Sequence, residues 1–102
     1  DEMMLPATVL GVDGAIGSTF NLNGVRAREI FESARSGNIA KALEVQHVTN
    51  DFISDVLANG LYGTLKIGLQ EAGVEAGYCR KPMGDYSDEM IARAKEIYHK
   101  YF

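Results

Sequence analysis

The sequence predicts an α/β chain that is mostly α-helical and contains one short β-strand. Apolar residues recur at helical spacing through most of the 102 residues. One segment, residues 12–17 (VDGAIG), is bracketed by glycines and too glycine-rich for a helix interior, which favours a strand. The order of helix, strand, Gly-Ser-Thr turn and helix is typical of a repeating β/α unit.

The first helix is expected over residues 3–10 (MMLPATVL), an apolar run that ends at Gly11. Pro6 fits there only within the first helical turn, where its missing N–H would be unpaired in any case. The next helix follows the Gly-Ser-Thr turn, with Asn23 as a possible N-cap and Gly37 as its end. Its apolar stripe, at spacings of three and four, consists of Ala27, Ile30, Phe31 and Ala34.

Three more helices are expected after Gly37. Asn38 can cap the first of them, which ends at Gly60 and has the apolar stripe Leu43, Val48, Phe52, Ile53, Val56 and Leu57. Residues 61–72 continue as a helical segment, and residues 73–86, with three glycines and a proline, form a connection. Ser87 or Asp88 starts the final helix, whose acidic residues come first and whose basic residues come last, as the helix dipole favours.

The single predicted strand poses a physical problem. A lone strand has no partner for its backbone N–H and C=O groups, and burying such groups unpaired is costly. Either residues 12–17 pair with strands outside this chain, or they do not form a strand. The first alternative suits a piece of a larger protein and the second suits a small helical domain.

Composition excludes several classes of protein. With 46% hydrophobic and 24% charged residues, the chain is expected to fold as one domain with a modest core. Its net charge of -4 argues against a nucleic-acid partner, and no apolar run approaches the ~20 residues needed to cross a bilayer. We therefore expect a cytoplasmic protein. The chain begins with Asp-Glu instead of Met, which suggests processing or a fragment.

No metal or other cofactor is expected. Cys79 is the only cysteine, which excludes an internal disulfide and any site built from several cysteines. His47 and His99 have no third ligand at a sensible spacing, so a metal site between them is not predicted.

One stretch carries a specific family resemblance. Residues 11–21 (GVDGAIGSTFN) are similar to the eighth strand and following turn of the N-acetylneuraminate lyase family, which belongs to the pyruvate-dependent Class I aldolases together with dihydrodipicolinate synthase. The acidic pair Asp1-Glu2 resembles the pair that follows the family's seventh strand. Further blocks occur at the expected distances: NLNG (21–24), HVTND (47–51), LANGLY (57–62) and CRKP (79–82).

The resemblance implies a (β/α)8 TIM barrel in the complete enzyme, with this chain as its C-terminal part. Residues 1–36 would be the last β/α portion of the barrel, comprising helix 7, strand 8 and helix 8. Residues 37–102 would be a C-terminal helical extension. Enzymes of this family are typically homotetramers, so a homo-oligomer is expected.

The implied activity is the reversible cleavage of N-acetylneuraminate, a sialic acid, to N-acetylmannosamine and pyruvate through a Schiff base on a lysine. In the family this lysine and the catalytic tyrosine come from strands earlier than any in this chain. None of the lysines here follows a predicted strand: Lys41, Lys66, Lys81, Lys95 and Lys100. We therefore predict no catalytic residue in the chain and no activity for the chain alone.

What remains is part of a sugar site. By position, Asp1, Glu2 and Ser18 correspond to family residues that bind substrate hydroxyls, and adjacent carboxylates can accept charge-assisted hydrogen bonds from a polyol. Two structural alternatives stay open: the acids stabilise a helix start, and Ser18 or Thr19 is an ordinary N-cap.

Two alternatives for function also stay open. The strand-eight sequence and the acidic pair favour the lyase over another pyruvate aldolase such as dihydrodipicolinate synthase. In a different class, the chain could be a non-catalytic helical domain that self-associates. Self-association of the isolated chain is expected in either case, because the apolar side of residues 12–16 would be exposed.

Overall fold

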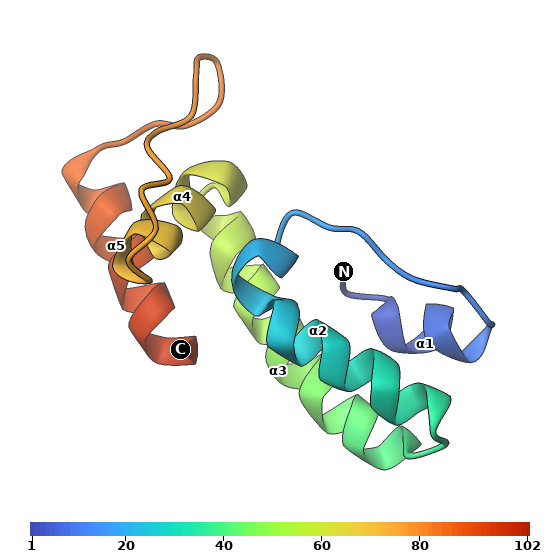
Figure 1. Ribbon diagram of the computed structural model, residues 1–102. Helices are drawn as coiled ribbons and strands as arrows, with labels where there is room; N and C mark the ends of the chain where they lie inside the picture. Colours follow the sequence, from blue (N-terminus) through green and yellow to red (C-terminus); the bar gives the residue numbers. More distant parts are fainter. The chain divides into compact units, whose positions relative to one another are not determined.

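The computed structural model describes residues 1–102, which form five α-helices and no β-strand (Figure 1). The helices are α1 (Met4–Val9), α2 (Phe20–Arg35), α3 (Ile39–Ala58), α4 (Leu61–Glu71) and α5 (Asp88–Tyr101). The chain divides into two compact units, unit 1 (Asp1–Ile53) and unit 2 (Ser54–Phe102). No helix has the length and apolar character needed to span a membrane.

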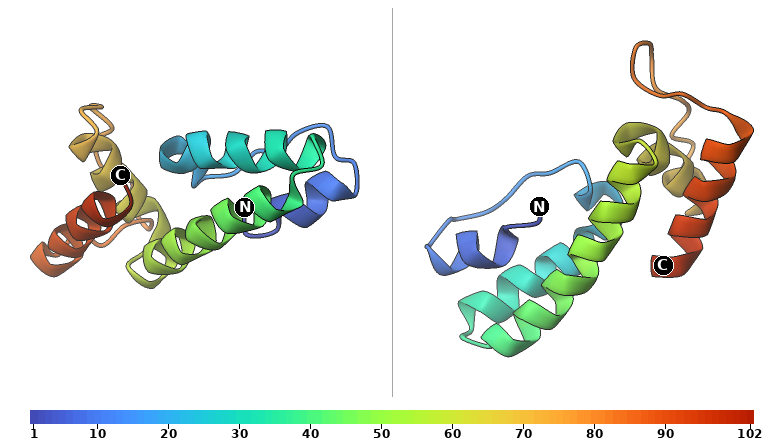
Figure 2. Two further views of the ribbon diagram at one scale, coloured as in Figure 1. Left: turned by 90° about the horizontal axis from the view of Figure 1, so that it is seen from below. Right: turned by 180° about the vertical axis from the view of Figure 1, so that it is seen from behind.

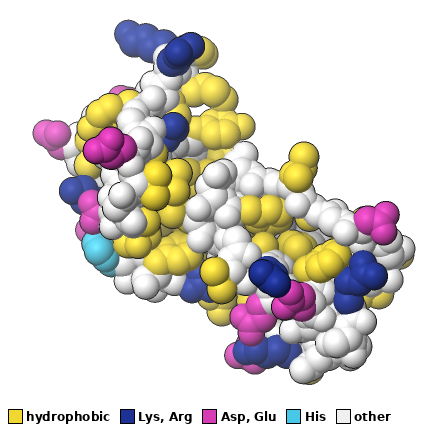
Figure 3. Space-filling view, in the orientation of Figure 1, with side chains coloured by type: hydrophobic (Ala, Val, Ile, Leu, Met, Phe, Trp, Pro, Cys, Tyr) yellow, Lys and Arg dark blue, Asp and Glu magenta, His cyan; other side chains and the backbone are white.

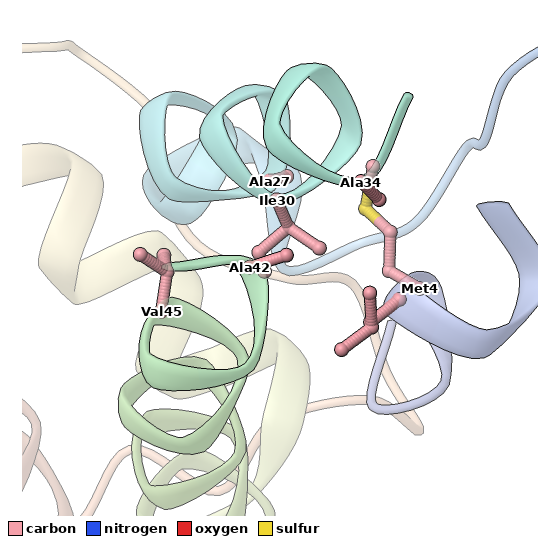
Figure 4. Close-up of a cluster of buried hydrophobic side chains, with 7 residues drawn as sticks. Met4, Ala27, Ile30, Ala34, Ala42 and Val45 are labelled. Carbon is pink, nitrogen blue, oxygen red and sulfur yellow. The ribbon is translucent and has the colours of Figure 1, made fainter. Parts of the chain in front are cut away.

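Unit 1 has a small hydrophobic core between three helices. The views of Figures 1 and 2 agree that α2 runs beside the first part of α3, and α1 packs against α2. Ile30 on α2 is fully buried, which stabilises the fold by roughly 2 kcal/mol relative to an exposed side chain. Figure 4 shows how side chains of all three helices point toward one another: Met4, Ala27, Ile30, Ala34, Ala42 and Val45.

The expected boundary between the second and third helices is confirmed. α2 ends at Arg35, and Gly37 has φ of +83°, a conformation that glycine adopts without the strain of a Cβ. Asn38 then accepts a hydrogen bond from the Lys41 N–H at 3.3 Å and so caps α3. The sequence therefore marks this turn correctly from its Gly-Asn pair.

The predicted N-cap role of Asn23 is wrong. α2 begins at Phe20, and Asn23 lies inside it at a point where the backbone is not helical (φ -93°, ψ 17°). Its side chain is fully buried and donates from Nδ2 to the Thr49 hydroxyl of α3 at 3.1 Å. A residue that looks like a cap in the sequence is instead a buried polar link between two helices.

Half of the apolar stripe predicted for α3 is also wrong. Phe52, Ile53 and Val56 are buried as expected. The other three members of the stripe are exposed: Leu43, Val48 and Leu57. The buried face continues instead through Ala42, Val45, Gln46 and Thr49. Because two of these residues are polar and have hydrogen-bond partners within the unit, hydrophobicity alone selects the wrong face.

The strand predicted over residues 12–17 is not present. This segment is neither helix nor strand, and the Ile16 side chain is fully exposed. A strand is defined by hydrogen bonds to a neighbouring strand, and the chain contains no second extended segment that pairs with this one. The sequence already indicated that a lone strand would lack a pairing partner, and without that partner the segment does not form a strand.

Unit 2 is held together largely by contacts of α5. α4 packs against α5, and the Ser87 hydroxyl accepts from the Met90 N–H at 3.2 Å, which confirms the expected start of the final helix. Asp55 of α3 accepts from Lys100 Nζ at 2.8 Å and from the Tyr101 hydroxyl at 2.9 Å. These hydrogen bonds hold the pKa of Asp55 below its usual value and raise the pKa of Lys100.

A second carboxylate of unit 2 binds the same helix. Glu71 lies at the end of α4, 3.3 Å from Lys95 Nζ and 3.1 Å from His99 Nε2. The hydrogen bond with Lys95 is the main cause that lowers the pKa of Glu71, and His99 adds to it. Asp55 and Glu71 therefore bind two places along α5.

Candidate functional site

The Asp1 carboxylate lies at the N-terminus of α2. Its Oδ2 accepts a hydrogen bond from the Thr19 N–H at 3.3 Å and another from the Thr19 hydroxyl. The side chain is only 14% exposed. A negative charge is favoured at a helix N-terminus, where the first backbone N–H groups lack partners inside the helix. Asp1 is thus fixed against a turn that lies 18 residues further along the chain.

Gly17 allows this close approach. A Cβ on Gly17 would overlap the Asp1 carboxylate, which occupies the space that any larger residue needs. Residues 17 and 19 therefore fix the carboxylate from two sides: one leaves room for it and the other donates to it.

Gln46 of α3 binds the backbone on both sides of Glu2. Its Oε1 accepts from the Leu5 N–H at 2.9 Å, and its Nε2 donates to the Asp1 carbonyl oxygen at 3.3 Å. The same Nε2 donates to Asn50 Oδ1 at 2.8 Å. The Gln46 side chain is 3% exposed, so a buried amide with its polar atoms satisfied secures the start of the chain to α3.

Ser18 lies between the two residues that contact Asp1. Its carbonyl oxygen accepts from the Asn21 side chain at 2.9 Å, which stabilises the turn into α2. Glu2 follows Asp1 directly, and its side chain is 52% exposed. The structure thus brings Asp1 against the turn that contains Ser18, with Glu2 adjacent in the chain.

Two structural roles were expected as alternatives for these residues: the acids stabilise a helix start, and Ser18 or Thr19 is an ordinary N-cap. The first turn of α1 contains no acidic residue, and the Asp1 carboxylate serves α2 instead. Thr19 occupies the N-cap position of α2, but its side chain makes no capping bond to its own helix. The Asp1 carboxylate therefore binds the N-cap residue of α2, and the first N–H groups of the helix donate to the carbonyl oxygens of the turn.

Sequence reasoning missed Thr19 and Gln46 as partners of Asp1. The Thr19 contact could have been found, because a Gly-Ser-Thr turn before a helix is a frequent place for an anion to bind. Gln46 gave no such signal: it lies 45 residues from Asp1 within a helix, and no local pattern indicates a contact at that distance.

The arrangement can bind a polyhydroxylated ligand but includes no lysine that could form a Schiff base. Carboxylate oxygens accept hydrogen bonds from hydroxyl groups, and a serine hydroxyl can both donate and accept. A Schiff-base lysine must lose its proton before it attacks, whereas the pKa of Lys100 is raised by Asp55. Lys41 and Lys95 are ion-paired with glutamates, and Lys66 donates to the Ala76 carbonyl oxygen at 2.7 Å.

Histidine, cysteine and acidic side chains do not gather into a metal site. No group of three such residues is arranged to hold an ion. His47 is exposed on α3, and His99 contacts Glu71 on α4.

An apolar groove of about 240 Å³ lies beside the segment that was predicted to be a strand. Its walls include Ala15 from that segment, Met4 from α1, and Phe20 and Phe31 from α2. Several hydrophobic side chains of unit 1 are exposed: Met3, Val9, Leu10, Val12, Ile16 and Val25. Hydrophobic groups also reach the surface on the face drawn in Figure 3.

The chain is similar to proteins of one family along its whole length. Residues 1–100 match the Dihydrodipicolinate synthetase family. N-acetylneuraminate lyase from Clostridium perfringens is 74% identical over 102 residues, which are 100% of this chain and 35% of that protein. The chain therefore spans about a third of the length of the curated relatives that it matches.

Solved structures agree. The crystal structure of CdNal from Clostridium difficile in complex with mannosamine has 72% identity and a TM-score of 0.97. N-acetylneuraminate lyase from Fusobacterium nucleatum complexed with pyruvate has 59% identity and a TM-score of 0.95. Both comparisons cover 100% of this chain and 35% of the solved one. By sequence and by backbone, the chain belongs to the dihydrodipicolinate synthetase family.

Proposed function

We propose that the chain is the C-terminal portion of a Class I aldolase that cleaves N-acetylneuraminate to N-acetylmannosamine and pyruvate. Its contribution is to bind hydroxyl groups of the sugar through Asp1, Glu2 and Ser18. The contact of the Asp1 carboxylate with the turn at Gly17 and Thr19 carries this proposal, because it brings Asp1 next to the turn that contains Ser18, although the two are distant in the sequence.

The chemistry of the site fits a polyol. Thr19 holds Oδ2 of Asp1, which leaves lone pairs on Oδ1 for a ligand hydroxyl. Glu2 offers a second, more exposed carboxylate beside it, and no hydrogen bond within the chain uses the Ser18 hydroxyl. Charged acceptors give stronger hydrogen bonds than neutral ones, so two carboxylates and a hydroxyl can select a ligand with several neighbouring hydroxyl groups.

The bond-breaking groups would come from outside residues 1–102. A Schiff base withdraws electrons from the carbon–carbon bond that breaks, and it needs an unprotonated lysine in the site. The family resemblance places that lysine on a strand earlier than any segment of this chain. We therefore expect the chain alone to release no pyruvate from N-acetylneuraminate.

In the complete enzyme we place residues 1–36 in the last β/α portion of a (β/α)8 barrel and residues 37–102 in a helical extension. Residues 12–17 would then form the eighth strand by pairing with strands outside this chain. Their exposed backbone and the apolar groove beside them support this placement. The family resemblance implies a homotetramer, and a cytoplasmic location is the expectation from the composition.

A hybrid enzyme tests the proposal. In it, residues 1–102 replace the matching 35% of the Clostridium perfringens lyase. We expect the hybrid to cleave N-acetylneuraminate, and we expect Asp1→Asn and Ser18→Ala to raise the KM for the sugar by roughly tenfold each, the loss of about one hydrogen bond to a ligand.

The matched control is Ser36→Ala. Ser36 lies at the other end of α2, and its hydroxyl donates to the Ser33 carbonyl oxygen at 3.0 Å. This variant should leave the KM unchanged. A hybrid that folds but does not cleave the sugar would refute the lyase assignment, and equal effects of the Ser18 and Ser36 variants would refute the sugar site.

The exposed apolar side chains of unit 1 favour a second proposal for the chain by itself, self-association. Exposed apolar surface of this kind is usually covered by a partner. Light scattering at increasing protein concentration should show a rising mass, and a constant monomer mass would contradict it. A chain that associates and also fails to support cleavage in the hybrid would favour a helical self-association domain over the lyase.

A further inference from the structure

We infer that Gln46 is a positioning residue for the sugar site. It would act from α3 by fixing the backbone that carries Asp1 and Glu2. The inference rests on the proposed function of those two carboxylates and adds a residue that touches neither the sugar nor the reacting atoms.

The reason begins with α1, a helix of six residues without a cap of its own. Its N-cap position, Met3, makes no side-chain hydrogen bond to the first turn. Such a short helix is marginal in isolation, because few hydrogen bonds offset the cost of ordering it. Gln46 supplies the missing acceptor, since its Oε1 binds the Leu5 N–H at 2.9 Å.

The same side chain also binds ahead of the helix. Its Nε2 donates to the Asp1 carbonyl oxygen, which in addition accepts from the Met4 N–H at 3.3 Å. One buried amide therefore holds residue 1 by its carbonyl and residue 5 by its N–H. Glu2 lies between these two fixed points, and its backbone has little freedom.

Two backbone groups fix the direction of the amide. The Leu5 N–H can only donate and the Asp1 carbonyl oxygen can only accept, so the oxygen end of Gln46 faces Leu5 and the nitrogen end faces Asp1. If the amide turned over, both of these hydrogen bonds would be lost. Asn50 adds a third hydrogen bond, because its Oδ1 accepts from Gln46 Nε2 at 2.8 Å.

Asp1 is held at two places by separate parts of unit 1. Gln46 holds its backbone carbonyl from α3, and Thr19 holds its carboxylate from the start of α2. If Gln46 is lost, the carboxylate keeps its partner but the backbone can shift, and Glu2 shifts with it. The expected effect falls on sugar binding, because a displacement of about 1 Å can weaken a positioned interaction by one or two orders of magnitude.

The experiment uses the hybrid enzyme in the synthetic direction, where the two substrates are varied separately. Gln46→Ala should raise the KM for N-acetylmannosamine about tenfold and leave the KM for pyruvate within twofold. The lysine that holds pyruvate as a Schiff base lies outside residues 1–102 under the proposed function. Borohydride trapping of the pyruvate Schiff base counts the intact active sites, so that loss of folded enzyme is measured separately.

Two further variants sharpen the test. Gln46→Glu retains an acceptor for the Leu5 N–H but cannot donate to the Asp1 carbonyl oxygen, and it should raise the same KM even if Gln46→Ala fails to fold. Gln70→Ala is the matched control, because Gln70 on α4 also donates to a backbone carbonyl, that of Gly77 at 2.8 Å. It should change neither KM.

The outcomes separate the two claims. An unsubstituted hybrid that folds without making or cleaving the sugar refutes the proposed function and this inference with it. An active hybrid in which both Gln46 variants keep the normal sugar KM refutes the inference alone. A Gln46 variant that raises both KM values equally also refutes it, since that result indicates a general structural role.

Discussion

Replacing Gly17 with alanine would place a methyl group where the Asp1 carboxylate now lies. The carboxylate is a short side chain held by Thr19, so it cannot turn aside without breaking that contact. We expect Gly17→Ala to displace Asp1 and to break both hydrogen bonds from Thr19.

The magnitude follows from the two bonds. Hydrogen bonds to charged groups contribute about 1.5–3 kcal/mol each, and the bond from the Thr19 N–H is long at 3.3 Å. The displaced carboxylate regains water, which offsets part of the loss. We therefore expect a loss of about 2 kcal/mol in the free energy of unfolding, measured by urea unfolding of the 102-residue chain with far-UV circular dichroism.

Gly24→Ala is the matched control. Gly24 lies inside α2, and nothing is within 4 Å of a Cβ built on it. Alanine is favoured over glycine in a helix by about 0.5–1 kcal/mol, so this variant should be more stable than the parent. If Gly17→Ala is as stable as Gly24→Ala, the Asp1 carboxylate does not occupy the space that a Cβ on residue 17 would fill.

Three further predictions concern other parts of the chain. Ile30→Ala should lower the free energy of unfolding by about 3 kcal/mol because it leaves a cavity in a closed core, and the exposed control Val25→Ala should cost less than about 0.5 kcal/mol in the same urea experiment. Asp55 has a lowered pKa, so its stabilisation is present above the ordinary carboxyl range and is lost as the pH falls through that lowered value. Asp55→Asn should therefore lose about 1 kcal/mol near neutral pH and less at acidic pH, with Asp51→Asn, an exposed carboxylate on α3, as control; a loss that does not depend on pH would contradict the ion-pair explanation. The isolated chain should release no pyruvate from N-acetylneuraminate in a coupled assay. Release by a preparation free of intact lyase would contradict the proposal that the bond-breaking groups lie outside residues 1–102.

Helix positions could be predicted from the sequence because their signals are local. Gly37 and Asn38 mark one boundary and Ser87 marks another, and each acts within a few residues of its own position. Which face of a helix is buried depends on residues that are more distant in the sequence. α3 buries Gln46 and Thr49 because partners from distant segments satisfy them, and no periodicity of apolar residues shows those partners.

The strand predicted over residues 12–17 could not be judged from this chain alone. Residues 12–17 have the composition of a strand, but a strand exists only when another strand pairs with it, and this chain provides none. For the candidate site, the family resemblance predicts Asp1, Glu2 and Ser18, and their binding of a sugar stays a prediction. The two residues that hold Asp1 in place were found only in the structure. The Gly-Ser-Thr turn is a local signal that could have indicated the Thr19 contact, whereas no local pattern indicates Gln46, which lies 45 residues from Asp1.

The most direct test of the central claim is a crystal structure of the hybrid enzyme with N-acetylmannosamine and pyruvate bound. Sugar hydroxyl groups should lie at about 2.5–3.0 Å, hydrogen-bond distance, from the carboxylates of Asp1 and Glu2 and from the Ser18 hydroxyl. A sugar bound in the barrel that leaves these three side chains out of contact would contradict the claim that this chain supplies the sugar-binding wall.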